Sequence, residues 1–334
     1  MQSSVPTILT DAFGRRHDYL RISITERCNL RCRYCMPAEG IPLTPKLHLL
    51  SFEEIERLAV MFVGLGVRKI RLTGGEPLVR TGVEELCASL SGIAGLNTLA
   101  LSTNGVLLQQ KARRLREAGV SQINISLDTL VPEKFKRITL RDNFDSVLEG
   151  IRIATRAGFD SVKINCVMIR GFNDDEIVDF VELANALGVH VRFIEFMPFS
   201  GNGWSMESLI SCREIRELIE IRYALDPVEA TDDLRGPAKE FLVRGGGGSV
   251  GFIATITEPC CHSCSRLRIT ADGRFRTCLF ARGEVDLRSL LRQGEGPEAL
   301  KFAIGEAVRA KWGQRPDPLE LSRLRDRAMV AIGG

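Results

Sequence analysis

The regular alternation of strand-like and helix-like segments through the first two thirds of the chain most constrains its fold. Short runs rich in β-branched residues alternate with amphipathic stretches of helical period, which is the pattern of repeated βα units. The predicted strands are 20–25, 68–72, 98–102, 122–127, 162–168 and 191–196.

Local capping signals mark the helices between these strands. The helix predicted at 52–65 begins with a capping box, Ser51 and Glu54, and ends at Gly66. Further helices are predicted at 83–90, 107–118, 145–157 and 174–187, and a glycine follows each of the last three.

Parallel strands joined by right-handed helical crossovers either close into a barrel or form an open sheet. Because six units are two short of a closed barrel, we expect an α/β fold, a partial (βα)6 TIM-type barrel with an open side. After residue 196 we expect a loop at 197–206, a helix at 209–219, irregular chain at 222–237, a hairpin or loop at 245–248 and a helix at 297–311. We predict that residues 1–220 form the barrel and that 221–334 form a C-terminal module covering its open side.

Composition restricts the class of protein. The 334 residues are 44% hydrophobic and 26% charged, with a net charge of +3, which favours neither a nucleic-acid nor a membrane partner. Neither a signal peptide nor a transmembrane run is readable. Ten cysteines without a secretory segment indicate a reducing compartment, so we expect a cytoplasmic protein whose clustered thiols bind metal.

Three cysteines, Cys28, Cys32 and Cys35, follow the first predicted strand with the spacing C-x-x-x-C-x-x-C. Three thiolates on one loop can hold a four-iron cluster and leave one iron open to another ligand. A zinc site would need a fourth protein ligand, and none follows at once.

A second cysteine cluster lies near the C-terminus. Cys261 and Cys264 form a C-x-x-C pair, and Cys278 returns after the turn at Asp272-Gly273, which is typical of metal ligands. From spacing alone, zinc with His262 as a fourth ligand remains open.

The first cluster, with Tyr34 before its third cysteine and the run Thr73-Gly74-Gly75-Glu76-Pro77, resembles the radical S-adenosylmethionine superfamily. The resemblance implies a partial barrel, a 4Fe-4S cluster on Cys28, Cys32 and Cys35, and S-adenosylmethionine bound by Tyr34, Gly75, Ser126 and Met197. Taken singly, Ser126 can equally be a strand-end hydrogen-bonding residue and Met197 a core residue.

The second cluster extends the resemblance. The run Cys-x-x-Cys-x-Arg-x-Arg, then Thr270 to Gly273 and Cys278-Leu279, resembles the GTP 3′,8-cyclase family, as does the chain from Phe13-Gly14-Arg15 to Gly333-Gly334. This implies a second 4Fe-4S cluster on Cys261, Cys264 and Cys278, with Cys260 as an alternative to Cys261. It also implies that GTP binds to Arg21, Arg71, Ser102, Lys163, Arg192, Arg266 and Arg268, although each alone could be a surface residue.

In this family, reductive cleavage of S-adenosylmethionine gives a radical that removes hydrogen from the ribose C3′ of GTP. The ribose then bonds to guanine C8, giving (8S)-3′,8-cyclo-7,8-dihydroguanosine 5′-triphosphate, in the first step of molybdenum cofactor biosynthesis. The resemblance also implies an electron donor, a cyclic pyranopterin monophosphate synthase that takes the product, and a homodimer. The rival classes are another two-cluster radical enzyme and a non-catalytic zinc or iron-sulfur binding module.

The last two residues, Gly333 and Gly334, form a pair without side chains. Terminal residues are usually frayed, but such a pair can also thread a narrow pocket and place a carboxylate beside arginines. The family resemblance implies the second role, so we expect both glycines in the active site.

Overall fold

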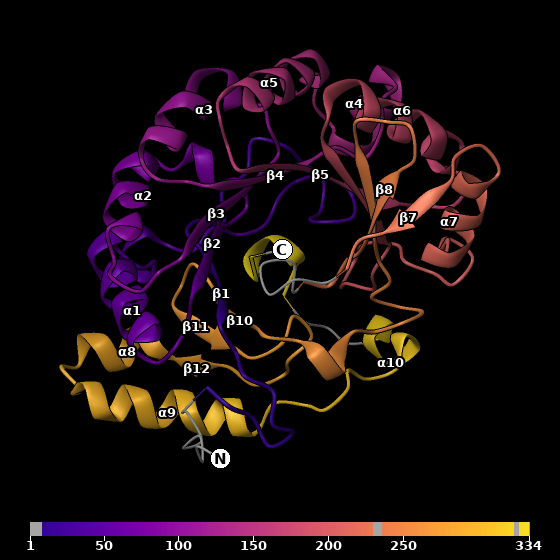
Figure 1. Ribbon diagram of the computed structural model, residues 1–334. Helices are drawn as coiled ribbons and strands as arrows, with labels where there is room; N and C mark the ends of the chain where they lie inside the picture. The colour runs from indigo at the N-terminus through magenta and orange to yellow at the C-terminus, as the bar shows by residue number, and fades with distance from the viewer. Residues whose placement is uncertain (1–8, 230–235, 324–326, 334) are drawn as a thin grey trace.

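A computed structural model describes residues 9–229, 236–323 and 327–333. Strands surround the centre of the molecule, and helices α1 to α7 lie outside them in an arc (Figure 1). The strands form one twelve-stranded sheet in the order β12-β11-β10-β1-β2-β3-β4-β5-β6-β9-β8-β7. Its two edge strands, β12 and β7, are not paired with each other in the described residues, so the sheet is an open, partial barrel.

The strands are β1 (Tyr19–Ser23), β2 (Lys69–Thr73), β3 (Thr98–Thr103), β4 (Gln122–Ser126), β5 (Ser161–Met168), β6 (His190–Glu195), β7 (Leu225–Pro227), β8 (Lys239–Val243), β9 (Ser249–Ile253), β10 (Arg266–Ile269), β11 (Arg274–Arg276) and β12 (Val285–Asp286). The α-helices are α1 (Phe52–Gly64), α2 (Val83–Ser91), α3 (Leu108–Glu117), α4 (Pro132–Thr139), α5 (Phe144–Arg156), α6 (Ile177–Leu187), α7 (Cys212–Glu220), α8 (Leu287–Arg292), α9 (Pro297–Arg309) and α10 (Pro318–Arg323).

The six strands expected from the sequence are all present, displaced by at most two residues at their ends. The capping box of α1 also forms, since Glu54 N–H donates to Ser51 Oγ and Ser51 N–H donates to the Glu54 carboxylate. The glycine run at 245–248 does form a hairpin, between β8 and β9.

Four parts of the chain differ from the expectation. Helices α4, α8 and α10 were not predicted, because each has at most eight residues and is too short to show a helical period. Part of the stretch expected to be irregular, 222–237, forms β7. Residues 230–235 of that stretch lie outside the described residues.

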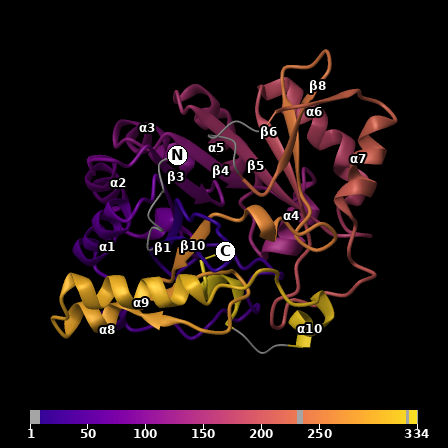
Figure 2. The same cartoon turned by 60° about the horizontal axis from the view of Figure 1, so that its bottom comes forward.

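The segment after β6 extends the barrel on both edges. β9 pairs in parallel with β6, and β10 pairs in parallel with β1. The α/β partial barrel is thus confirmed, while the C-terminal strands share its sheet. A domain boundary at residue 220 stays a prediction. Figure 2 shows α8 and α9 side by side along the lower edge of the molecule, where α8 contacts β11 and α9 contacts β12.

The alternation along each barrel strand separates core from site. On β1, Leu20 and Ile22 are fully buried in the core shared with the helices, while Tyr19 and Arg21 line the inner cavity. Such alternation follows from the two-residue period of a strand. One face of the strand packs against the core, and the other face presents polar groups to the inner cavity. Among the described residues, we find no helix with the length and apolar character needed to span a membrane.

Candidate active site

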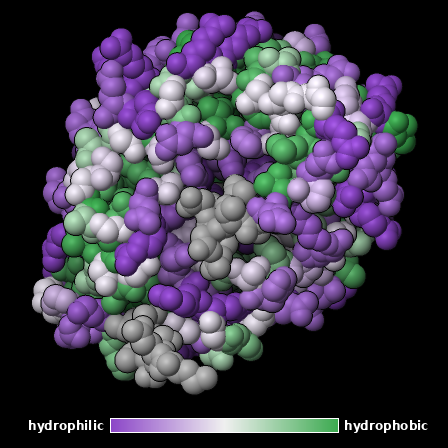
Figure 3. All heavy atoms as spheres, in the orientation of Figure 1, coloured by the Kyte–Doolittle hydropathy of each residue, from purple (hydrophilic) through white to green (hydrophobic). Residues whose placement is uncertain are grey.

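One cavity inside the barrel, of about 280 Å³, brings together most of the residues singled out from the sequence. Hydrophilic side chains ring a hollow near the centre of the face shown in Figure 3. The predicted residues that line the cavity are Arg21, Cys28, Cys32, Tyr34, Cys35, Arg71, Gly75, Ser102, Ser126, Lys163, Arg192, Met197, Arg266 and Arg268.

The loop that carries Cys28, Cys32 and Cys35 follows β1 and is fixed by backbone hydrogen bonds. Arg31 N–H and Arg33 N–H each donate over 2.9 Å to carbonyls at the end of α4, and Cys35 N–H donates to the Cys32 carbonyl over 2.9 Å. The unpredicted helix α4 therefore supports the cysteine loop.

The donor set of this loop fits an iron-sulfur cluster. Burial raises the pKa of the Cys28 thiol, holds that of Cys32 well above its ordinary value and raises that of Cys35 to about 12. Thiolates are the usual ligands of iron-sulfur clusters, and coordination to iron would deprotonate these thiols. The three thiols line one cavity, as a shared cluster requires.

The side chain of Tyr34 is hydrogen-bonded to Asp128, a residue that the sequence analysis did not select. Its hydroxyl donates to the Asp128 carboxylate over 2.7 Å, and Val167 N–H donates to the other oxygen of Asp128 over 2.9 Å. Burial raises the pKa of Asp128 to about 6. Its place just after β4, at the carboxyl end of a barrel strand, is the signal that could have identified it.

The glycine pair after β2 allows the backbone to approach the cysteine loop closely. A Cβ at Gly75 would lie 2.4 Å from the Arg27 carbonyl oxygen, and one at Gly74 would lie 2.7 Å from that of Thr25. Gly75 N–H donates to Thr25 over 2.7 Å. Only glycine fits at these two positions, so the pair joins the cysteine loop to β2 and leaves backbone groups facing the cavity.

Positive charge gathers at the inner face of the strands. Arg71 donates to the Tyr19 hydroxyl over 2.6 Å and to Ser102 Oγ over 3.4 Å. Burial, with the nearby Arg192, lowers the pKa of Lys163 to about 8. Lys69, which the sequence analysis missed, lines the same cavity and alternates with apolar residues on β2. A polyanionic ligand fits this concentration of cations.

A smaller adjoining cavity, of about 60 Å³, holds the second cysteine cluster. Cys260, Cys261, Cys264 and Cys278 all line it, whereas His262 is exposed and is not among its lining residues. Arg266 and Arg268 line both cavities and so connect them. In the described part of the chain, no three or more His, Cys, Asp or Glu side chains lie close enough together to hold a single metal ion.

The charges around Cys264 distinguish it from the first three cysteines. Burial opposes ionisation, but the positive charges of Arg266 and Lys311 lower the pKa of the Cys264 thiol to about 6. Lys311, another residue that the sequence analysis missed, lies 3.7 Å from Cys264 Sγ and donates to the Arg266 carbonyl over 2.9 Å. A thiolate held beside two cations fits an anionic cluster ligand.

The C-terminal tail enters the barrel, as Figure 1 shows. The Gly333 carbonyl oxygen accepts hydrogen bonds from Arg268 Nη1 over 3.0 Å and from Thr73 Oγ1 over 3.3 Å. Met329 lines the inner cavity. Gly334, the other predicted tail residue, lies outside the described residues.

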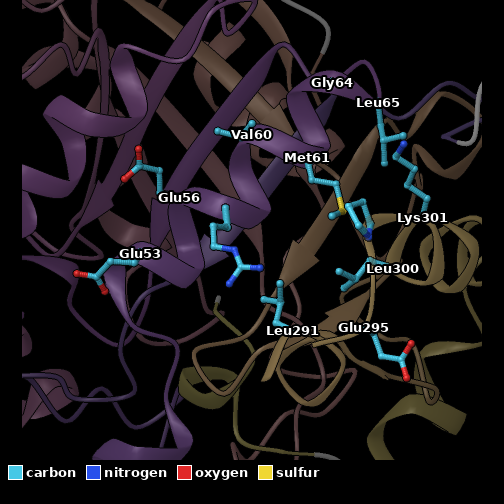
Figure 4. A pocket seen from close by; sticks show the side chains of 12 residues that line it. Glu53, Glu56, Val60, Met61, Gly64, Leu65, Leu291, Glu295, Leu300 and Lys301 are labelled. Carbon is cyan, nitrogen blue, oxygen red and sulfur yellow. The ribbon is translucent and has the colours of Figure 1, made fainter. Parts of the chain in front are cut away.

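A larger hollow, of about 630 Å³, lies on the outside of the molecule between α1 and the α8–α9 segment (Figure 4). It is lined by residues such as Val60, Met61 and Leu300 and contains none of the predicted site residues. We place the active site in the inner cavity, because it brings together the first three cysteines, Gly75 and most of the predicted cations.

Comparison with known families covers nearly the whole chain. Residues 22–184 match the family described as "Radical SAM superfamily", and residues 189–316 match "Molybdenum Cofactor Synthesis C". Among solved structures, Streptococcus suis SuiB bound to S-adenosylmethionine aligns with a TM-score of 0.59 at 14% identity, covering 85% of this chain and 68% of that one. That likeness supports the fold alone.

Full-length relatives are more informative. "GTP 3′,8-cyclase, mitochondrial" of Arabidopsis thaliana is 50% identical over 99% of this chain and 84% of its own length. "GTP 3′,8-cyclase" of Moorella thermoacetica is 46% identical over 98% of this chain and 100% of its own. The chain spans about half, 51%, of the mouse "Molybdenum cofactor biosynthesis protein 1". This chain therefore belongs to the GTP 3′,8-cyclase family of radical SAM proteins.

Proposed function

We propose that this chain is a GTP 3′,8-cyclase, a radical SAM lyase that converts GTP to (8S)-3′,8-cyclo-7,8-dihydroguanosine 5′-triphosphate in the first step of molybdenum cofactor biosynthesis. One observation carries the proposal. Arg266 and Arg268 lie between the cavity of the first cysteine loop and the cavity of the second cysteine cluster. A nucleotide bound to these two arginines would therefore reach both cavities.

Residues that line the inner cavity would hold the cofactors. In this proposal Cys28, Cys32 and Cys35 bind one 4Fe-4S cluster, and Tyr34, Gly75, Ser126 and Met197 bind S-adenosylmethionine. When bound, these groups supply one-electron radical chemistry. The chain positions them and encloses them within the barrel, which limits the access of water to a reactive species.

The cationic residues would bind the substrate. Arg21, Arg71, Lys163 and Arg192 face the cavity from neighbouring strands and suit a triphosphate, since charge-assisted hydrogen bonds to phosphate are strong. Ser102 would add a hydroxyl contact.

Arg266 and Arg268 would direct the guanine base toward the second cavity. There Cys261, Cys264 and Cys278 would hold a second 4Fe-4S cluster. Cys260 lines the same cavity and stands as the alternative ligand to Cys261.

The tail would complete the substrate site. The hydrogen bond from Arg268 to Gly333 connects the tail to a proposed GTP ligand, so the Gly333-Gly334 end would orient Arg268 during catalysis. We also propose a cytoplasmic homodimer that takes electrons from a separate donor and passes its product to a cyclic pyranopterin monophosphate synthase.

Anaerobic incubation of the reconstituted protein with GTP, S-adenosylmethionine and a chemical reductant tests the proposal. We expect the cyclised nucleotide, identified by mass spectrometry and NMR, together with 5′-deoxyadenosine and methionine. Cys32→Ala should abolish all three products, whereas Cys87→Ala, in the buried face of α2, should retain them. Cleavage of S-adenosylmethionine without any cyclised GTP would instead favour a radical enzyme with another substrate.

A further inference from the structure

Two residues that line the inner cavity each carry a buried amide oxygen without a hydrogen-bond partner in the described part of the chain. The two atoms are Oδ1 of Asn124 on β4 and Oδ1 of Asn165 on β5. Asn124 is only 6% exposed, and both residues line the cavity. A buried carbonyl oxygen without a partner costs free energy, so two on residues that line one cavity indicate a ligand that donates hydrogen bonds to them.

The strand register places each asparagine between residues assigned to the substrate or cofactor. Asn124 pairs with Ser102 on β3 and with Lys163 on β5. Asn165 pairs with Ser126 on β4 and with Arg192 on β6. The asparagines are thus diagonal neighbours on adjacent strands, where the proposed GTP and S-adenosylmethionine sites meet.

Their chemistry differs from that of the residues around them. Lysine and arginine side chains only donate hydrogen bonds, whereas these two oxygens only accept. Phosphate oxygens of a nucleotide at neutral pH are acceptors, so they cannot satisfy the asparagines. The donors of GTP are the ribose hydroxyls and the N–H groups of guanine. We assign the base to the side of Arg266 and Arg268 and the triphosphate to the other cations. The ribose joins these two parts of GTP, so in this arrangement its hydroxyl groups face the asparagines.

We propose that Asn124 and Asn165 accept hydrogen bonds from the 2′- and 3′-hydroxyl groups of the GTP ribose. This inference rests on the proposed function and adds a specificity determinant to it. The pair would distinguish ribonucleotides from deoxyribonucleotides. It would also hold the sugar between the triphosphate site and Ser126, next to the proposed S-adenosylmethionine site.

Equilibrium binding to the reconstituted full chain tests the proposal without requiring turnover. The ligands are GTP, 2′-deoxy-GTP and 3′-deoxy-GTP, and S-adenosylmethionine is measured separately. Each deoxy analogue should bind about fivefold or more weakly than GTP, as expected for a lost hydrogen bond that leaves a buried acceptor unpaired. Asn124→Leu and Asn165→Leu, which remove the acceptor at similar volume, should reduce that preference toward unity. Asn97→Leu, at an exposed position outside the cavity, should preserve it.

Three results would overturn the proposal. The first is equal binding of GTP and both deoxy analogues by the unaltered chain, a comparison that needs no folded variant. The second is a deoxy penalty that persists in both variants. The third is weakened binding of S-adenosylmethionine with an unchanged deoxy penalty, which would assign the pair to the ribose of that cofactor. Failure of the unaltered chain to bind any guanine nucleotide would overturn the proposed function itself.

Discussion

The carboxylate of Glu240 on β8 accepts a hydrogen bond of 2.8 Å from Nε of Arg192 on β6, although β9 lies between these two strands. Gly251 on β9 makes this possible, because it pairs with Arg192 on one side and with Glu240 on the other. A Cβ there would lie 2.5 Å from Glu240 Oε2 and 3.2 Å from Arg192 Cγ. Glu240 thereby fixes the side chain of Arg192, which we propose binds GTP.

We predict that Glu240→Gln lowers the free energy of unfolding by about 3 kcal/mol, because it leaves a largely buried guanidinium without its charged partner. The two side chains are 13% and 8% exposed. Urea denaturation measures the change. Asp226→Asn is the matched control, since Asp226 pairs with Arg244 on the same hairpin but at exposures of 43% and 67%. That exposed pair should contribute at most about 1 kcal/mol, and an equal loss in both variants would contradict the prediction.

Gly333→Ala should lower the rate of GTP cyclisation about tenfold or more while leaving both clusters in place. Its Cβ would lie 2.7 Å from Ser23 Cβ and 3.0 Å from Thr73 Oγ1, which would displace the carbonyl that Arg268 contacts. A lost hydrogen bond to a charged group corresponds to about 1.5 to 3 kcal/mol. Iron content and single-turnover cyclisation are the measurements.

Gly294→Ala provides the control for backbone strain. Gly294 has a φ of +76° and Gly333 one of +72°, but a Cβ at Gly294 would have no heavy atom within 4 Å. Both variants carry the same left-handed strain, and only Gly333→Ala adds a steric clash in the barrel. Equal activity of the two variants would show that the tail position is unimportant for cyclisation.

Glu76 should make stability depend on pH. Burial raises its pKa from 4.5 to about 7, although Asn104 N–H, Leu78 N–H and Thr103 donate to its carboxylate. Since the folded state binds this proton more tightly than the unfolded state, the contribution of Glu76 is present below about pH 4.5. It is lost as the pH rises through 7.

Glu76→Gln removes this dependence. Relative to the unaltered chain, its deficit in unfolding free energy should therefore shrink by roughly 2 to 3 kcal/mol between pH 5 and pH 8. Urea denaturation of the cluster-free protein at the two pH values measures it. A deficit that is constant, or that grows with pH, would show that Glu76 is already ionised at pH 5 in the folded protein.

Metal analysis should find about eight iron and eight sulfide per chain after anaerobic reconstitution, and about half of each after Cys28, Cys32 and Cys35 are replaced by alanine. Stoichiometric zinc would instead support the metal-binding alternative. Comparing Cys260→Ala with Cys261→Ala assigns the remaining ligand. We expect iron loss only from Cys261→Ala, and the opposite result would identify Cys260 as the ligand.

Much of the site could be predicted because its residues are neighbours in sequence or belong to recognisable runs. The loop from Cys28 to Cys35, the glycines at 74 and 75 and the pair Arg266 and Arg268 each lie on one short segment, so their spacing carries the signal. Asn124, Asn165 and Lys311 carried no such signal. A single polar residue in a strand or at the end of a helix has the same appearance whether it faces a cavity or solvent.

The sequence by itself determined the βα order, the helix boundaries marked by Ser51 and the glycines, and the two sets of cysteines, because these depend on local propensity, capping and spacing. Only the tertiary structure decided how the ends of the chain meet. β10 pairs with β1, and Arg268 contacts Gly333, through contacts between distant segments that local pattern does not specify. The shared cavity arises from the twist and register of the whole sheet, which depend on the packing of all its strands together.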